Sequence, residues 1–120
     1  MNPEQEARER IDAMLEQAGW TVQDYKLYDP RASDGIALRE FPLNTGYADY
    51  LLIVRREAVG VIEAKKVGTP LAGVDSQSDK YLHGMPDEIP HPSPLPFAYE
   101  STGAETYFRD VREPNARSRK

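Results

Sequence analysis

Cysteine is absent from this 120-residue sequence, which excludes disulfides, thiolate nucleophiles and cysteine-bound zinc sites. Histidine is scarce as well, with His83 and His91 alone, so any metal ion would be held by carboxylates and would suit Mg²⁺ or Mn²⁺. No apolar run approaches the roughly 20 residues that cross a bilayer, and the acidic N-terminal segment lacks the apolar core of a signal peptide. We therefore expect a cytoplasmic protein with no membrane partner.

The formal net charge of −5 argues against nucleic-acid binding when it is taken alone, because proteins that neutralise phosphates are usually basic. The charges are unevenly distributed, however. Residues 1–20 carry five acids against two arginines, whereas residues 112–120 carry four bases against one acid. The charge balance therefore weakens a nucleic-acid function without excluding it.

The pattern of apolar residues predicts a helix over residues 3–18, with Asn2 as its N-cap and Gly19 as its stop. Five prolines within residues 85–96 predict an extended, non-helical connection. Strands are predicted over residues 36–43, 50–54, 59–64, 97–102 and 105–111, and a second helix over residues 71–82.

Both faces of the strands over residues 50–54 and 59–64 are apolar, which is typical of strands that are covered on two sides. We therefore predict one α/β domain over residues 1–111, built on a mixed sheet of four to five strands flanked by α-helices. Residues 112–120 have no apolar periodicity and are predicted to form a linker.

The strands over residues 50–54 and 59–64 are predicted to form a hairpin, and charged residues stand at its open end. Asp49 and Glu63 are equally distant from residue 56, so a hairpin symmetric about that residue would place their Cβ atoms about 4.5–5.5 Å apart. Because two carboxylates this close repel each other, one would be protonated or both would bind a cation. Lys65 is two residues beyond Glu63, so strand alternation places it on the same face.

Two carboxylates and an ammonium group on one face suit metal-assisted hydrolysis of phosphodiesters. Asp49 and Glu63 would hold one or two Mg²⁺ ions, which polarise a phosphate and lower the pKa of a bound water. Lys65 would orient or deprotonate that water, or stabilise charge that develops on the phosphate. The spacing also fits a structural interpretation, in which Asp49 and Lys65 are solvated strand ends and Glu63 pairs with Lys65.

The predicted second helix carries Gln77 and Tyr81, an i,i+4 pair on one face. The glutamine amide and the tyrosine hydroxyl would position a DNA phosphate or steady the lysine. The structural alternative is a surface glutamine beside a packed tyrosine.

Several segments resemble the N-terminal nuclease domain of the restriction (R) subunit of type I restriction-modification enzymes, in the order and approximate spacing of that family. Residues 48–66 resemble the PD-(D/E)xK core of the restriction-endonuclease-like superfamily, with Ala48 in place of the usual proline. Gln77 and Tyr81 match the QxxxY motif that narrows the resemblance. The supporting segments read RIDAMLEQAGW, REFPLNTGYADYLL, GVIEAKKVG, QSDKY and LPFAYESTGAETYF.

The resemblance implies a restriction-endonuclease-like fold, with Asp49 and Glu63 as metal ligands and Lys65 as the catalytic lysine. Glu16 on the first helix or Glu40 on the first predicted strand would supply a further ligand. The alternative for each of these two acids is a solvated position on a helix face or at a strand end.

The same resemblance implies double-stranded DNA as the substrate, and modification and specificity subunits as partners. Family R subunits carry an ATP-driven motor after this domain, but no G-x-x-x-x-G-K-[ST] occurs in the sequence. We therefore expect ATP to act only through a motor that this chain lacks. The leading hypothesis is the Mg²⁺-dependent nuclease domain of a type I site-specific deoxyribonuclease. A non-catalytic DNA-binding or docking module and a DNA-end-processing exonuclease stay open as alternatives.

Overall fold

The computed structural model describes residues 2–71, 81–92 and 94–113. In chain order its elements are α1 (Pro3–Gln17), β1 (Thr21–Asp24), the 3₁₀ helix η1 (Tyr25–Leu27), β2 (Gly35–Leu43), β3 (Gly46–Val54), β4 (Glu57–Ala64), β5 (Phe97–Ser101) and β6 (Thr106–Asp110). The predicted second helix lies largely outside the described residues, although Tyr81 and Leu82 at its end are helical. Most of the predicted linker lies outside them too.

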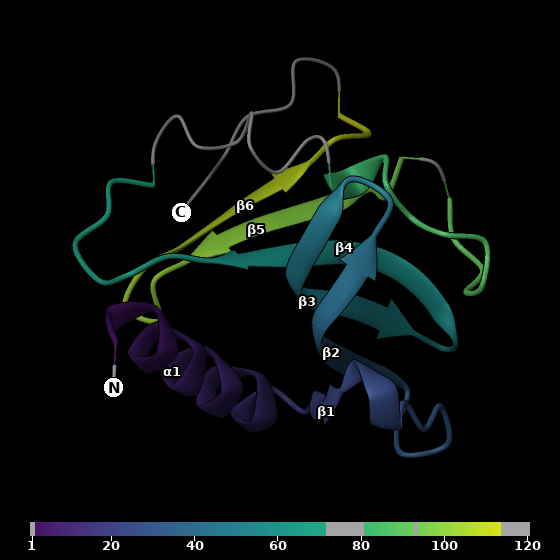
Figure 1. The fold of residues 1–120 in the computed structure, drawn as a ribbon, viewed down its shortest axis with the longest axis horizontal. Coiled ribbons are helices and arrows are strands. Elements are labelled where there is room, and N and C mark those ends of the chain that lie inside the picture. Colours follow the sequence, from purple (N-terminus) through teal and green to yellow (C-terminus); the bar gives the residue numbers. More distant parts are fainter. Residues whose placement is uncertain (1, 72–80, 93, 114–120) are drawn as a thin grey trace.

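The strands form one mixed sheet in the order β1-β2-β3-β4-β5-β6, with α1 beside it (Figure 1). β1 runs parallel to β2 and β4 runs parallel to β5, while the other neighbouring pairs are antiparallel. The fold is therefore mixed α/β and mostly β. The predicted count of four to five strands is wrong, because β1 adds a sixth. Its sequence TVQD is short and lacks apolar alternation, so its pairing with β2, rather than local propensity, makes it a strand.

Helix α1 forms as the sequence predicts. Asn2 Oδ1 accepts a hydrogen bond from the backbone N–H of Gln5 at 2.8 Å, and the Gln5 side chain accepts one from the backbone N–H of Asn2 at 3.4 Å. This capping box satisfies backbone donors that the first turn cannot pair internally. Gly19 follows the helix with a φ of +97°, a left-handed conformation that favours glycine. Trp20 then packs back onto the core beneath α1.

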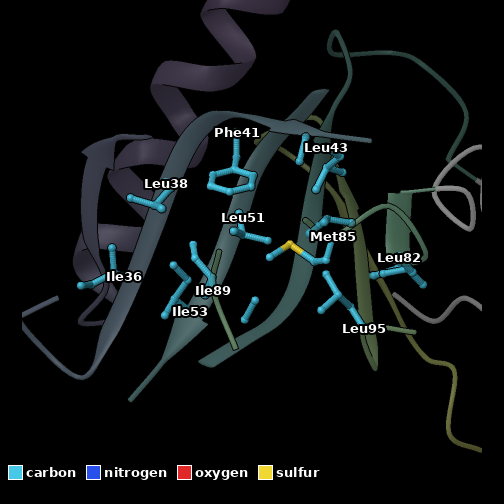
Figure 2. Close-up of a cluster of buried hydrophobic side chains, with 14 residues drawn as sticks. Ile36, Leu38, Phe41, Leu43, Leu51, Ile53, Leu82, Met85, Ile89 and Leu95 are labelled. Carbon is cyan, nitrogen blue, oxygen red and sulfur yellow. The ribbon is translucent and has the colours of Figure 1, made fainter. Parts of the chain in front are cut away.

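The sheet buries apolar side chains on both faces, which confirms the expectation of strands covered on two sides. Along β3, Tyr50 and Leu52 pack with the helix residues Ile11 and Leu15. The alternating positions belong to a larger cluster on the opposite face, which Figure 2 shows. Its labelled members are Ile36, Leu38, Phe41, Leu43, Leu51, Ile53, Leu82, Met85, Ile89 and Leu95.

The proline-rich connection covers the face of the sheet that lies opposite α1. Its apolar residues Met85, Ile89 and Leu95 are buried in the larger cluster. Backbone hydrogen bonds fix this segment to the strands, since Ala58 N–H donates to the Pro90 carbonyl at 2.9 Å. The prolines therefore enforce a non-helical path over the described part of this segment, and the residues between them supply the core contacts.

The β3–β4 hairpin turns through Arg55 and Arg56, which have φ values of +50° and +69°. Two consecutive positive φ values are those of a type I′ turn, whose twist matches the flanking strands. The register then shifts between Leu52 and Ile53, which leaves Val59 as an extra residue on β4. This bulge restores pairing that is symmetric about residue 56 over the part of the hairpin farther from the turn. The sequence expectation of symmetry is therefore met there, through a two-residue turn plus a bulge.

We expect the double variant Arg55→Asn, Arg56→Gly to unfold at a higher denaturant concentration than the wild type. Asparagine and glycine tolerate the left-handed region better than arginine, so the gain in the free energy of unfolding should be about 1 kcal/mol. Urea titration followed by circular dichroism measures this difference. The matched control, Arg55→Gln, Arg56→Gln, removes the same charges without relieving the backbone. An equal gain in that control would assign the effect to charge repulsion instead.

Within the part of the chain that the structure describes, no helix has both the length and the apolar character needed to cross a membrane.

Candidate functional site

Asp49 on β3 and Glu63 on β4 lie next to each other at the end of the hairpin that is remote from its turn. Tyr50 is the Cα partner of Ile62, so Asp49 and Glu63 are the next positions along the two strands. Their carboxyl groups are joined by a hydrogen bond. Asp49 Oδ2 also accepts a hydrogen bond from the backbone N–H of Ala64 at 2.8 Å. The structure thus brings the two acids together.

Two further acids extend this pair into a row across the sheet. On one side, Glu40 of β2 lies opposite Asp49, between two registered pairs of β2 and β3. On the other side, Glu63 is the Cα partner of Glu100 on β5, whose side chain is buried with a residue exposure of 1%. Glu40 has a φ of +57°, so the regular alternation of β2 is interrupted at this point. Glu100 is not among the site residues predicted from the sequence. The available signal was an acid at an inward-facing position of the apolar strand FAYES.

Lys65 and Tyr81 both lie within electrostatic range of the acid pair. The charge of Lys65 lowers the pKa of Glu63 and so opposes the larger effects that raise it. Burial raises the pKa of Tyr81, and the negative charges of Glu63 and Asp49 raise it further. The Tyr81 ring packs over Gly46 at the start of β3, where an added Cβ atom would lie 3.0 Å from a ring carbon. The two acids, the lysine and the tyrosine therefore occupy one neighbourhood.

Arg8 of α1 also reaches this neighbourhood, although it is not among the site residues predicted from the sequence. One terminal nitrogen of its guanidinium donates to Asp49 Oδ1 at 2.5 Å, and the other donates to Glu40 Oε1 at 3.0 Å. Partial burial lowers the pKa of Arg8. The hydrogen bond and charge of Asp49, together with the charges of Glu40 and Tyr50, outweigh this effect, so the net pKa is raised. The available signal was helical spacing, since Arg8 precedes the buried Ile11 by three residues and Leu15 by seven.

Three further residues predicted from the sequence, Gln77, Glu16 and Glu40, do not join the acid pair among the described residues. Gln77 lies outside the described residues, so the QxxxY pattern is represented by Tyr81 alone. Glu16 is exposed near the end of α1, about 12 Å along the helix axis from Arg8. Glu40 is close to Asp49, but its side chain is 65% exposed and its ion pair is with Arg8.

The acid pair is electrostatically strained. Burial raises the pKa of Glu63 to about 8, with added contributions from its hydrogen bond to Asp49 and from the Asp49 charge. Glu100 adds a smaller effect in the same direction. At neutral pH and without a cation, the protonated form of Glu63 therefore predominates. A nearby cation would favour the ionised form.

The donor set suits a hard divalent cation. Both acids offer carboxylate oxygens, and Mg²⁺ is commonly held by one or two carboxylates together with water and substrate phosphates. Among the described residues, no group of three or more histidines, cysteines or acids has the arrangement of a complete metal cage. The pair Asp49 and Glu63 therefore fits a cation that is shared between protein and substrate, which is the usual arrangement for Mg²⁺ at phosphate-processing sites.

Comparison with known proteins bears on what such a site is for. Residues 21–100 match the family described as the second domain of the type I restriction enzyme EcoKI endonuclease subunit. The chain belongs to this family. The EcoKI endonuclease subunit of Escherichia coli (strain K12) is 27% identical over 143 aligned residues, which cover 85% of this chain and 12% of that protein. No solved structure matches the chain. The restriction-endonuclease-like fold therefore stays a prediction, whereas membership of a type I restriction-subunit family is established.

In this restriction-subunit domain, we expect stability without metal to fall as pH rises from about 5 to 8. The unfolded chain loses the Glu63 proton near its ordinary pKa, while the folded protein keeps it up to about pH 8. The free energy of unfolding should drop by on the order of 2 kcal/mol, after allowance for partial solvent exposure. Urea titrations in EDTA at pH 5 and pH 8.5 measure the drop.

Glu63→Gln removes the titrating group while keeping the side-chain shape. Its free energy of unfolding should fall less over the same pH interval than that of the wild type. Parallel pH profiles for the two proteins would show that Glu63 does not titrate abnormally.

Proposed function

We propose that this chain is the Mg²⁺-dependent endonuclease domain of a type I restriction subunit and hydrolyses phosphodiester bonds of double-stranded DNA. The observation that carries the proposal is the pairing of Asp49 with Glu63 at one sheet end, with Lys65 and Tyr81 beside them. Family membership supports a role in restriction. The proposal assigns the cutting step to this domain.

Asp49 and Glu63 would hold the Mg²⁺ ion, which when bound supplies polarisation of the scissile phosphate and a lowered pKa for a bound water. The Ala64 N–H fixes one oxygen of Asp49, so that carboxylate is oriented before any ligand arrives. Glu63 would lose its proton to solvent if it bound such a cation, because a carboxylate binds a cation in its ionised form. Mn²⁺ would serve in the same way as Mg²⁺.

Lys65 follows Glu63 at the end of β4, where its backbone N–H donates to the Ser101 carbonyl at 2.8 Å. That bond continues the parallel pairing with β5 past the end of β4 and fixes the backbone that carries the lysine. The Lys65 ammonium would orient the attacking water or stabilise negative charge that develops on the phosphate. Tyr81 would steady the lysine or a DNA phosphate through its hydroxyl.

Sequence recognition and movement along DNA fall to other parts of such an enzyme. The chain spans 12% of the length of the EcoKI endonuclease subunit that it matches. We propose that the modification and specificity subunits are its partners, and that ATP acts only through a motor domain outside the described residues. Delivery of DNA by that motor would reconcile a nuclease with a net charge of −5.

We expect Lys65→Ala in the intact subunit, assembled with its partners, to slow DNA cleavage by about 10²-fold or more while ATP hydrolysis continues. Loss of a positioned proton-transfer or charge-stabilising group typically costs that much. Conversion of supercoiled plasmid to linear product measures cleavage. Lys66→Ala is the matched control, because Lys66 is the next residue and is exposed.

Equal cleavage by the Lys65 and Lys66 variants would contradict the role of Lys65. Degradation of linear but not circular DNA would favour an end-processing exonuclease. Cleavage that also survives Asp49→Asn would leave this domain a docking role.

A further inference from the structure

Arg8 contributes to the acid pair from a different element, across the gap between α1 and the sheet. We propose that Arg8 is a positioning residue for the cation site: its guanidinium holds Asp49 in the orientation that binds a divalent cation, and Glu40 holds the guanidinium. This inference rests on the proposed function, because it assumes that Asp49 and Glu63 bind such a cation. It assigns roles to two residues, Arg8 and Glu40, that neither touch the substrate nor ligate the metal.

Both oxygens of Asp49 are fixed by donors from the protein. Oδ1 accepts from Arg8 at 2.5 Å and Oδ2 accepts from the Ala64 N–H at 2.8 Å. A carboxylate oxygen has two lone pairs, so one on each oxygen is left by these two donors. One of the remaining pairs accepts the Glu63 proton, and a cation that replaced this proton would use that position. The Asp49 side chain is only 12% exposed, so few water molecules can compete with these donors for its oxygens. A carboxylate held in this way loses little rotational freedom when it binds a cation.

Arg8 and Glu63 approach Asp49 from opposite faces of the sheet. Arg8 lies on α1, which packs on the face lined by Ile62 and Ala64 of β4. Glu63 lies between these two residues in the strand, so its side chain points to the other face. A cation shared by Asp49 and Glu63 therefore has no need to displace Arg8.

The positive charge of Arg8 would repel a divalent cation if it stood alone. Glu40 offsets that charge through its own ion pair with the second guanidinium nitrogen at 3.0 Å. Glu40 adopts a left-handed backbone conformation, with a φ of +57°, next to Asp49 in the β2–β3 pairing. Strained non-glycine backbone persists where the surrounding structure requires it, and here it places the carboxylate that anchors Arg8.

A second contact fixes the helix turn that carries Arg8. The Tyr50 hydroxyl lies 2.9 Å from the Arg8 carbonyl and 2.5 Å from Asp12 Oδ1, and its single proton is shared between these two acceptors. Burial and the hydrogen bond to Asp12 raise the pKa of Tyr50, so the hydroxyl stays protonated. Arg8 is thus held through both its backbone and its guanidinium. The planar fork of an arginine is needed to bridge two carboxylates, which the point charge of a lysine does not do as well.

The test measures Mn²⁺ affinity directly, by electron paramagnetic resonance of free Mn²⁺ during titration of the chain at pH 8. We expect Arg8→Met to weaken Mn²⁺ binding by about 10- to 100-fold, the usual effect of removing a residue that orients a metal ligand. Arg8→Lys should bind with intermediate affinity. Glu40→Gln, at an exposed position that leaves Asp49 untouched, should weaken binding by a smaller factor.

Arg39→Met is the matched control for a structural role of α1. Arg39 also joins the sheet to this helix, but its 3.3 Å ion pair is with Asp12, whereas that of Arg8 is with Asp49. Mn²⁺ affinity should stay at the wild-type value in this variant. A fall as large as that in Arg8→Met would show that docking of α1, rather than orientation of Asp49, sets the affinity, and would overturn the inference.

The outcomes separate this inference from the function on which it rests. Wild-type binding that is lost in Asp49→Asn but unchanged or tightened in Arg8→Met and Arg8→Lys would overturn the role of Arg8 and leave the proposed cation site standing. Wild-type protein that binds Mn²⁺ no better than Asp49→Asn would overturn both.

Discussion

The site depends on two carboxylates that the β3–β4 hairpin forces together. Asp49 and Glu63 directly follow the last registered pair of that hairpin, Tyr50 with Ile62. They share a hydrogen bond and are partly buried. In water two such groups would separate, but here the apolar core on both sides of the strands fixes their spacing. Burial raises the pKa of Glu63 to about 8, so at neutral pH the pair keeps one proton. We propose that a divalent cation takes the place of this proton.

Other parts of the fold place further charged and polar groups around this acid pair. The bulge at Val59 sets the register that brings Glu63 level with Asp49. Pairing of β4 with β5 places the buried Glu100 beside Glu63 and continues through the backbone of Lys65. Tyr81, just before the proline-rich connection, packs over Gly46. Helix α1 brings Arg8 to the opposite side of Asp49. Residues far apart in the sequence thus surround two adjacent strand ends.

The sequence predicts the local features well and the long-range ones poorly. Capping by Asn2, the hairpin and its two acids follow from propensity, periodicity and counting from the turn, all of which act over a few residues. Strand β1 was missed because only its pairing with β2 makes it a strand. Arg8 and Glu100 were missed because each reaches the site through packing between distant elements. A helix-face arginine and a strand acid carry no local mark of the partner that they will meet. The bulge at Val59 is of the same kind, since only the register reveals it.

We propose that Asp49 and Glu63 together bind one divalent cation. Anomalous diffraction from crystals grown with Mn²⁺ at pH 8 tests this most directly. We expect an anomalous peak at bonding distance, about 2 Å, from an oxygen of each carboxylate, with Arg8 still bound to Asp49 on the other side. Mn²⁺ that binds only elsewhere, while Asp49 and Glu63 keep their mutual hydrogen bond, would contradict it.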